Sequence, residues 1–173
     1  MPHALAEYTD KIAGLSALNE KLGLTGCYQN HAGRLVGATM FEIAQILQKA
    51  NLKHMGAQYD IRHATLEGGL SWQTGFQLIQ SNIKTIVLKD FIWEKKNGKW
   101  ASKNVPLGEG MVDFTTFFKL LKTFQIDVPI CLHLEHPLGG ADQGAPKITV
   151  DKQVVFNAMK RDLNMAKDLW AQA

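Results

Sequence analysis

The sequence predicts an α/β fold in which the strands of a parallel sheet alternate along the chain with helices. Two observations predict it: short apolar runs alternate with stretches of helical periodicity, and four of these runs end abruptly in ionisable or amide residues. In parallel barrels the chemistry lies at the carboxyl ends of the strands, so the four polar clusters are expected on one rim. They are Tyr28-Gln29-Asn30-His31, Tyr59-Asp60-Ile61-Arg62-His63, Leu88-Lys89-Asp90 and Leu132-His133-Leu134-Glu135-His136.

The helices are predicted by apolar residues at helical spacing and by residues that begin or end helices. Gly23 ends the first helix. Thr39, with Glu42 three positions later, caps the second, and Ser71 and Asp113 begin the third and fourth. The expected helices span residues 3–22, 39–51, 71–81, 113–124 and 150–170.

The strands are predicted by short apolar runs, of which the β-branched run 83–88 is the clearest. A long loop follows that run, and long loops in compact domains are usually functional. Within the loop, Asn97-Gly98 predicts the turn of a hairpin over residues 93–100. Cys27 and Cys131 are expected to be buried free thiols inside strands. The expected strands lie near 24–29, 55–60, 83–89 and 128–134.

The length of 173 residues predicts a single domain over 1–173. A complete (β/α)8 barrel takes about 250 residues and eight strands, so four strand–helix units correspond to the second half of such a barrel. A sheet of this kind with helices on one face leaves its inner face and both edges exposed. We therefore expect either a homodimer, in which a second copy covers the open half-barrel, or a fragment whose N-terminal half is missing. The fragment is the favoured alternative.

Composition excludes several classes of protein. The apolar fraction of 46% and the charged fraction of 20% are ordinary for a globular chain. A net charge of +3, spread in small groups, lacks the basic stripe that nucleic-acid binding requires. No apolar stretch approaches the ~20 residues that span a bilayer, so no membrane partner is expected. A cytoplasmic location is the default expectation, and an export signal could lie in a missing N-terminal half.

Carboxylates and imidazoles at separate strand ends are typical ligands of a divalent ion. Asp60 and Glu135 end two different strands, and the spacing Asp60-x-x-His63 places two ligand types at one strand exit. The alternative is structural: Asp60 pairs with Arg62 or caps a loop.

Lys89 follows directly on a buried strand. An ammonium group there can neutralise a developing enolate or hold a substrate hydroxyl, and the structural alternative is an ion pair with Asp90 or Glu109. Glu109 lies between two glycines in a turn that is not a phosphate loop. Three histidines near strand ends are candidate proton carriers, namely His31, His133 and His136.

Taken together, these motifs resemble the xylose isomerase-like TIM barrels, the sugar phosphate isomerase/epimerase superfamily. The matching pieces occur in the family's order, cover nearly the whole chain and correspond to strands five to eight of that barrel. They are Asn30-His31, Asp60-x-x-His63, Leu88-Lys89-Asp90, Pro106-Leu107-Gly108-Glu109-Gly110-x-Val112-Asp113-Phe114 and Leu134-Glu135.

The resemblance implies a divalent metal (Mn, Mg, Co or Zn) held by Glu, Asp, His and Glu from the last four strands. The two glutamates would also move a proton between neighbouring carbons of a ketose. Asp60, Glu135 and His63 match the aspartate, the final glutamate and the histidine beside the aspartate. Gln29 stands where the first glutamate is usual, and Val87 stands where a ligand histidine precedes Leu-Lys-Asp. These two departures should weaken metal binding severely and remove one proton-transfer carboxylate.

The leading hypothesis is a carbohydrate-active isomerase, epimerase or lyase that acts next to the carbonyl of a small-molecule sugar. Glu135 is expected to be the base, with a pKa raised by partial burial, while Lys89 and His63 polarise the oxygen. A metal at Asp60, Glu135 and His63 would be weakly held. The residues expected to bind the substrate are Gln29, Asn30, His31, Arg62 and Glu109.

Two other functions remain open at this point. Gln29 and Val87 motivate a degenerate, non-catalytic sugar-binding member of the superfamily. One branch of the same barrel cleaves DNA at abasic sites, but this chain lacks the glutamate and histidine ligands of that branch and has no concentrated basic surface.

Overall fold

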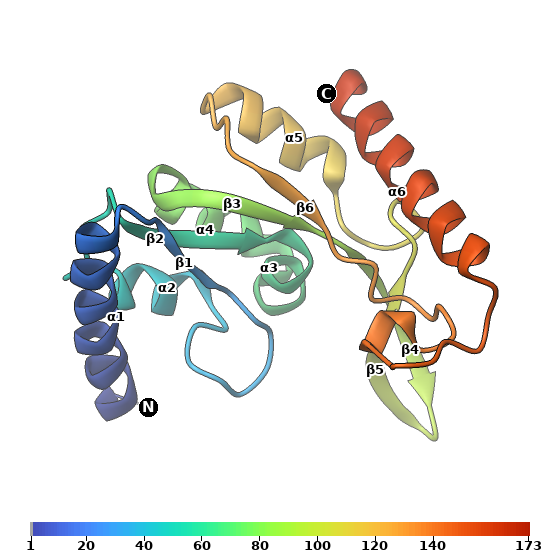
Figure 1. Cartoon of the computed structure of the whole chain (residues 1–173), viewed down its shortest axis with the longest axis horizontal. Coiled ribbons are helices and arrows are strands. Elements are labelled where there is room, and N and C mark those ends of the chain that lie inside the picture. The colour runs from blue at the N-terminus through green and yellow to red at the C-terminus, as the bar shows by residue number, and fades with distance from the viewer. Residues whose placement is uncertain (1) are drawn as a thin grey trace. The chain divides into compact units, whose positions relative to one another are not determined.

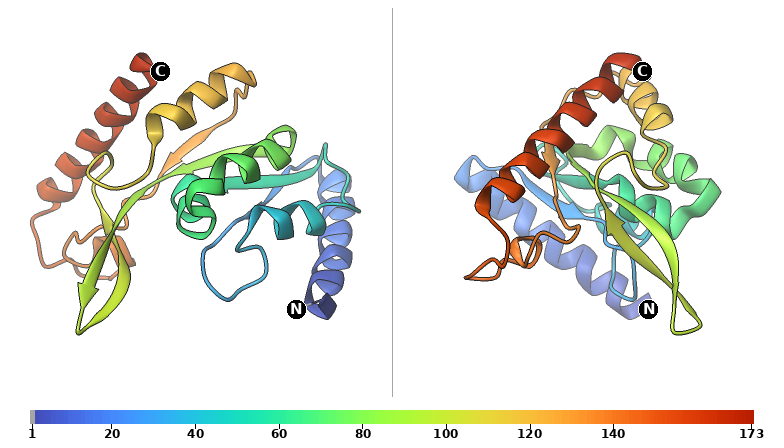
Figure 2. Two further views of the ribbon diagram at one scale, coloured as in Figure 1. Left: turned by 180° about the vertical axis from the view of Figure 1, so that it is seen from behind. Right: turned by 90° about the vertical axis from the view of Figure 1, so that its right-hand side faces the viewer.

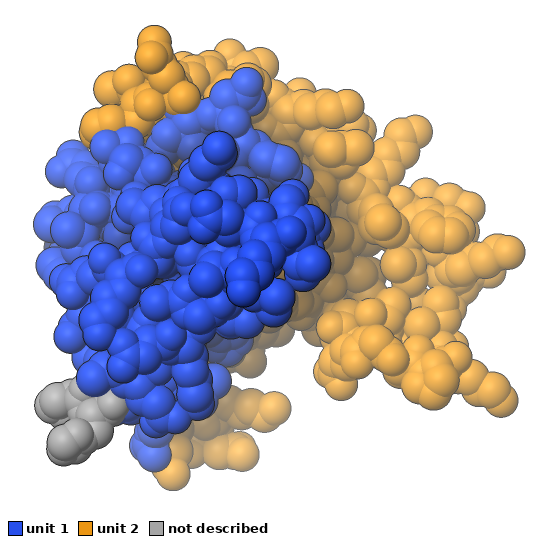
Figure 3. All heavy atoms as spheres, turned by 60° about the vertical axis from the view of Figure 1, so that its left-hand side comes forward, with its two compact units in different colours: residues 1–87, 126–130 blue, residues 88–125, 131–173 orange. Residues whose placement is uncertain are grey.

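The computed structural model describes residues 2–173, with side chains from residue 4 onward. The chain forms two compact units, coloured separately in Figure 3. Unit 1 comprises the residues up to 87 together with 126–130, and unit 2 comprises residues 88–125 and 131–173. Each unit is described by itself. The single domain expected over 1–173 stays a prediction.

The α/β fold class is confirmed. Four strands form one sheet in the order β1 (Gly26–Gln29), β2 (Met55–Asp60), β3 (Ile83–Leu88) and β6 (Ile130–Leu132). Strands β1 and β6 are its edges, so the sheet is not closed into a barrel (Figure 1). Strands β1 and β2 are parallel, as are β2 and β3. Helices alternate with strands along the chain, as in one part of a (β/α) barrel.

Unit 1 carries most of the sheet and a buried apolar core. Its fully buried side chains include Ile43, Tyr59, Phe76 and Ile86, each 0% exposed. The ring of Tyr59 packs edge-on against Phe76 at a centroid distance of 5.4 Å. The elements are α1 (Pro2–Leu22), β1 (Gly26–Gln29), α2 (Met40–Ile46), β2 (Met55–Asp60), α3 (Ile61–Gly68), α4 (Trp72–Ile79) and β3 (Ile83–Leu88).

Unit 2 contains a hairpin and two adjacent helices. The turn residues Asn97 and Gly98 both have positive φ, 52° and 78°, as the twist of a two-residue hairpin requires. The hairpin is therefore confirmed, although it is longer than predicted (Figure 2). Phe118 on α5 packs edge-on against Trp170 on α6 at 5.6 Å. The elements are β4 (Asp90–Lys96), β5 (Lys99–Val105), α5 (Phe114–Thr123), α6 (Lys152–Gln172) and the last two residues of β6 (Ile130–Leu132).

Two helix predictions need correction. Thr39 does cap α2 by accepting a hydrogen bond from the Glu42 N–H, but the helix ends at Ile46 instead of residue 51. Ser71 makes no capping bond, because its hydroxyl donates to the carbonyl of Gly68. Gly68 is the last residue of α3 (Ile61–Gly68), a helix between β2 and α4 that was not predicted from the sequence.

The last strand is shorter and less buried than predicted. It covers Ile130–Leu132 instead of 128–134, and it lies at an edge of the sheet. Cys131 is exposed and Cys27 is partly buried, so the prediction of two buried thiols is wrong. The reason is that β1 and β6, which carry the two cysteines, are the edges of the open sheet. Within residues 2–173, no helix is long and apolar enough to cross a membrane.

Asp90 organises the loop that leads from the hairpin to α5. Its carboxylate accepts four backbone N–H groups, from Phe91, Gly108, Gly110 and Val112, at 2.8–3.1 Å. Burial raises the pKa of Asp90 above its usual value, although the four donors counteract that effect. A Cβ atom at Gly110 would overlap this carboxylate, which explains the glycine.

We predict that Asp90→Asn lowers the free energy of unfolding by about 3 kcal/mol, because an amide NH₂ would face two N–H donors whichever way it turned. Urea denaturation measures the loss. The matched control is Asp113→Asn, which removes a charge from an N-cap where Asn serves as well as Asp, and it should change stability little. Equal losses in the two variants would contradict the role assigned to Asp90.

Candidate functional site

Asp60 is the centre of a polar cluster at the carboxyl end of β2, inside unit 1. It is fully buried, and its Oδ2 accepts a hydrogen bond of 2.9 Å from Nε2 of Gln29, the last residue of β1. Its Oδ1 accepts the N–H of His63 and so caps α3. The side chain of Asn30 bonds both the N–H and the carbonyl of Asp60, at 2.8 and 3.0 Å. These bonds fix the orientation of the Asp60 side chain. The structural alternative predicted that Asp60 caps a loop; it is a cap, but the element that it caps is the helix α3.

His63 joins this cluster through both ring nitrogens. Arg62 Nη1 lies 3.1 Å from His63 Nδ1. A guanidinium group only donates, so Nδ1 is assigned as the acceptor and the ring proton lies on Nε2. That nitrogen is 3.7 Å from Asp60 Oδ2. The ring of His31 lies against that of His63 at a centroid distance of 4.1 Å.

Five of the predicted site residues are thus brought together around Asp60, within one unit. They are Gln29, Asn30, His31, Arg62 and His63.

Lys89 and Glu135 form the second cluster, inside unit 2. Lys89 Nζ lies 2.9 Å from Glu135 Oε1, and the lysine side chain is 3% exposed against 38% for the glutamate. His133 Nδ1 lies 3.4 Å from the same oxygen. Asn104, from β5, donates to Glu135 Oε2 at 3.4 Å. A buried ammonium group requires a nearby anion, and Glu135 supplies it.

The electrostatics of Glu135 differ from the prediction. Burial raises its pKa, but the hydrogen bond and charge of Lys89, together with His133, outweigh burial and hold the pKa below its usual value. The predicted raised pKa is therefore wrong. Partial burial was identified correctly, but the partner that reverses its effect was not. Glu135 is a carboxylate throughout the neutral range.

Some residues lie elsewhere or were missed. Glu109, a predicted substrate-binding residue, is exposed, and its carboxylate is 3.9 Å from Arg161 Nη1. His136 is buried against Asp162 on α6, with Nε2 3.4 Å from Oδ2. The sequence reading missed Asn104, because nothing in the hairpin sequence distinguishes it from other polar strand residues.

The residues present do not fit the divalent metal that the resemblance implies. Among the side chains that the structure describes, from residue 4 onward, no three His, Cys, Asp or Glu residues are grouped so that they could hold an ion. In unit 1 the amide of Gln29 donates to the Asp60 oxygen that a metal would need. In unit 2 the described neighbours of the Glu135 carboxylate are Lys89, His133 and Asn104, and none of them is a second carboxylate.

We predict that the double variant Gln29→Glu/Val87→His binds Mn²⁺ at least about tenfold more tightly than the natural chain. Val87 is the register partner of Asp60 on β3, so the new imidazole would leave the same face of the sheet. Titration calorimetry measures the affinity, and Val87→His alone, which adds no carboxylate, is the control. Equal Mn²⁺ affinity of the natural chain and the double variant would contradict this account.

We also predict that the Glu135 side chain titrates at a lower pH in the folded chain than in the unfolded chain, because its folded pKa is lowered. Because the folded pKa is lowered, its ionisation contributes stability above the unfolded pKa, and that stability is lost as the pH falls through the folded value. Carbon-13 NMR measures the midpoint. Lys89→Met should raise it, whereas the exposed control Lys119→Met should not. A midpoint in the folded natural chain that is not lower than that of the unfolded chain would contradict the pairing.

Comparison with known proteins identifies the family of this chain. The profile of the xylose isomerase-like TIM barrel matches residues 2–149. No curated protein matches the chain. D-psicose 3-epimerase from Clostridium cellulolyticum H10 is 10% identical, with a TM-score of 0.70, and the match covers 94% of this chain and 55% of that one.

Two further solved structures share the fold. A xylose isomerase-like TIM barrel protein from Mycobacterium smegmatis, in complex with magnesium, is 11% identical, with a TM-score of 0.66 and coverage of 98% and 53%. The probable 3-DHS dehydratase AsbF from Bacillus anthracis is 18% identical, with a TM-score of 0.59 and coverage of 73% and 48%. The chain spans about half the length of these structures. Because the family profile covers most of its residues, the chain belongs to the xylose isomerase-like TIM barrel family.

Proposed function

We propose that the chain contributes an isomerase or epimerase activity that transfers a proton at the carbon next to the carbonyl of a sugar. The observation that carries the proposal is the 2.9 Å pair of Lys89 and Glu135, a base beside a fixed cation. Family membership supports the reaction class, since the similar structures include D-psicose 3-epimerase and L-ribulose 3-epimerase.

In the proposed step, the Glu135 carboxylate takes the proton from the carbon beside the carbonyl. The electron pair of that C–H bond moves to the carbonyl oxygen and forms an enolate. Lys89 donates a hydrogen bond to this oxygen, and because the ammonium group is almost fully buried, its charge is poorly screened there. The hydroxyl proton on the deprotonated carbon then moves to the enolate oxygen, and the protonated Glu135 returns its proton on the same face to the former carbonyl carbon, so that the carbonyl shifts by one carbon. Inversion at the same carbon would require a second proton donor on the opposite face.

The ion pair also tunes the base. While Lys89 holds Glu135, the lowered pKa makes the carboxylate a weak base. When the substrate binds, its carbonyl oxygen accepts a hydrogen bond from Lys89, which weakens the ion pair between Lys89 and Glu135. The pKa of Glu135 then rises. Glu135 therefore becomes a stronger base only when the substrate carbonyl is bound.

The polar side chains of the Asp60 cluster are the groups that unit 1 offers for binding sugar hydroxyls. Gln29, His31, Arg62 and His63 are proposed to take part, with His63 held by Arg62 and facing Asp60. Asn30 is 1% exposed and bonded to the backbone of Asp60, which is a positioning role. The polarising role of His63 stays a prediction.

A sugar-binding member without catalysis is the second candidate. It is favoured by Gln29, whose amide donates to Asp60 where the family usually has a glutamate. The double variant Asp60→Ala/Glu135→Ala separates the candidates, because it abolishes turnover if the chain is catalytic. Unchanged ligand affinity and turnover would overturn the roles assigned to both carboxylates.

The decisive experiment is a screen of aldoses, ketoses and keto-sugars, with and without divalent ions. For a converted sugar, Glu135→Gln should lower kcat/KM by about 10³-fold and Lys89→Met by about 10²-fold, as expected for a general base and for an oxyanion donor. The exposed helix residue Glu20 gives a charge-matched control, and Glu20→Gln should leave kcat/KM unchanged. Turnover that survives Glu135→Gln would contradict the proposal.

A further inference from the structure

The hairpin β4–β5 carries two exposed tryptophans on one face. Trp93 is 44% exposed and Trp100 is 66% exposed. The register pairs Trp93 with Ser102 and Trp100 with Lys95, and directly opposed residues of an antiparallel pair lie on the same face. The two indoles are therefore diagonal neighbours, within reach of each other for side chains of this size. Exposed apolar side chains that adjoin in this way are typical of a binding surface.

The two faces of the hairpin differ in chemistry. Phe91 precedes Trp93 by two residues on the same face, and the two rings meet edge to face at a centroid distance of 6.2 Å. Phe91 is 2% exposed, so the inner end of this face is anchored, whereas the tip projects away from α5 and α6 (Figure 2). We call the face formed by Phe91, Trp93 and Trp100 the aromatic face. The opposite face is charged and carries Glu94, Lys96, Lys99 and Lys103.

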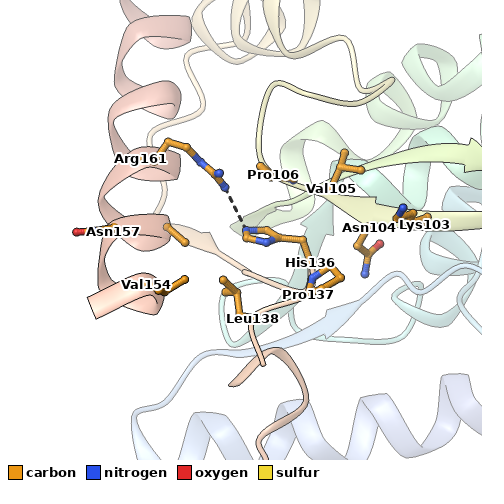
Figure 4. A pocket seen from close by; sticks show the side chains of 11 residues that line it. Lys103, Asn104, Val105, Pro106, His136, Pro137, Leu138, Val154, Asn157 and Arg161 are labelled. Atoms are coloured by element: carbon orange, nitrogen blue, oxygen red, sulfur yellow. Dashed lines mark hydrogen bonds between the residues drawn. The ribbon is translucent and has the colours of Figure 1, made fainter. Parts of the chain in front are cut away.

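Asn104 connects the aromatic face with the candidate base. It is the register partner of Phe91, so its side chain leaves β5 on that face, and it lies beside residues 136–137 (Figure 4). Its Nδ2 donates to the main-chain oxygen and to Oε2 of Glu135 at 3.3 and 3.4 Å. Glu135 therefore borders the inner end of the aromatic face. The two indoles follow at roughly 7 and 14 Å along the hairpin, at about 3.4 Å per residue.

The chemistry of the aromatic face fits a sugar ring. The C–H bonds on one side of a pyranose ring carry partial positive charge and the face of an indole carries partial negative charge, so the two stack. The ammonium group of Lys95, opposite Trp100, can donate hydrogen bonds to hydroxyls at the edge of that ring. A protein partner would not require the face to lead to Glu135, whereas a sugar that reacts at Glu135 would.

We propose that Trp93 and Trp100 bind a second sugar ring, joined by a glycosidic bond to the ring whose carbonyl lies at Glu135. The preferred substrate is then a glycoside that carries a keto group, instead of a free ketose. The position of the reacting ring rests on the proposed function, whereas the stacking of a sugar ring on the hairpin does not.

The test is an NMR titration of the ¹⁵N-labelled chain with cellobiose, maltose and lactose, and with glucose for comparison. At least one disaccharide should shift the indole N–H signals of Trp93 and Trp100 at millimolar concentration and leave that of the buried Trp72 unchanged. Trp100→Ala should weaken binding about fivefold, the contribution of one stacked ring, and Trp100→Tyr should restore most of it. Phe156→Ala removes an exposed ring from α6 and should have no effect.

A second variant covers the case in which the loss of an indole unfolds the hairpin. Lys95→Gln changes an exposed side chain of the aromatic face and should weaken disaccharide binding about threefold, whereas Lys96→Gln on the charged face should not. The proposal is overturned if no disaccharide binds more tightly than glucose, or if binding is unchanged in Trp100→Ala and Lys95→Gln. Self-association that Trp100→Ala abolishes, without disaccharide binding, would also overturn it and would identify an interface between copies.

The outcomes separate this inference from the proposed function. Disaccharide binding at the two indoles without turnover of any sugar removes the proposed function and leaves the second-ring site intact. Turnover of a free ketose that depends on Glu135, without disaccharide binding, does the reverse. If both hold, a keto-disaccharide should have a higher kcat/KM than the corresponding keto-monosaccharide, and Trp100→Ala should remove that advantage.

Discussion

The ion pair between Lys89 and Glu135 is the interaction on which the chemistry of unit 2 depends. Lys89 follows β3 directly and is almost fully buried, so its charge must be compensated, and the carboxylate 2.9 Å away does so. The same contact keeps Glu135 ionised. A fixed ammonium group therefore stands beside the glutamate that, by the family resemblance, matches the final metal ligand.

In unit 1, Asp60 accepts a hydrogen bond from Gln29 where the family resemblance implies a metal ion. A glutamate in place of Gln29 would put a second carboxylate next to Asp60, and two buried carboxylates require a cation or a proton between them. The amide donates to Asp60 instead. Both clusters are thus complete without an added charge, which is the physical reason why the residues present do not fit a divalent ion.

Local features could be predicted from the sequence, and long-range ones could not. The strand over 55–60, the Asn97-Gly98 turn and the Asp113 cap depend on neighbouring residues, and all three are confirmed. Helix α3 was missed because the sequence Asp-Ile-Arg-His after an apolar run was interpreted as a loop that follows the strand. The predicted direction of the Glu135 pKa shift was wrong because Lys89, the partner that lowers the pKa, lies 46 residues away in the sequence. Asn104 reaches Glu135 only through the path of the hairpin.

Deuterium exchange into a ketose tests most directly whether Glu135 and Lys89 move a proton without a metal. The chain would be treated with a chelator, transferred to D₂O and incubated with the ketose, and NMR would follow the C–H signal beside the carbonyl. The account predicts that this signal is lost with the natural chain and persists with Glu135→Gln. Exchange that appears only after a divalent ion is added, or that is equal in Glu135→Gln, would contradict it.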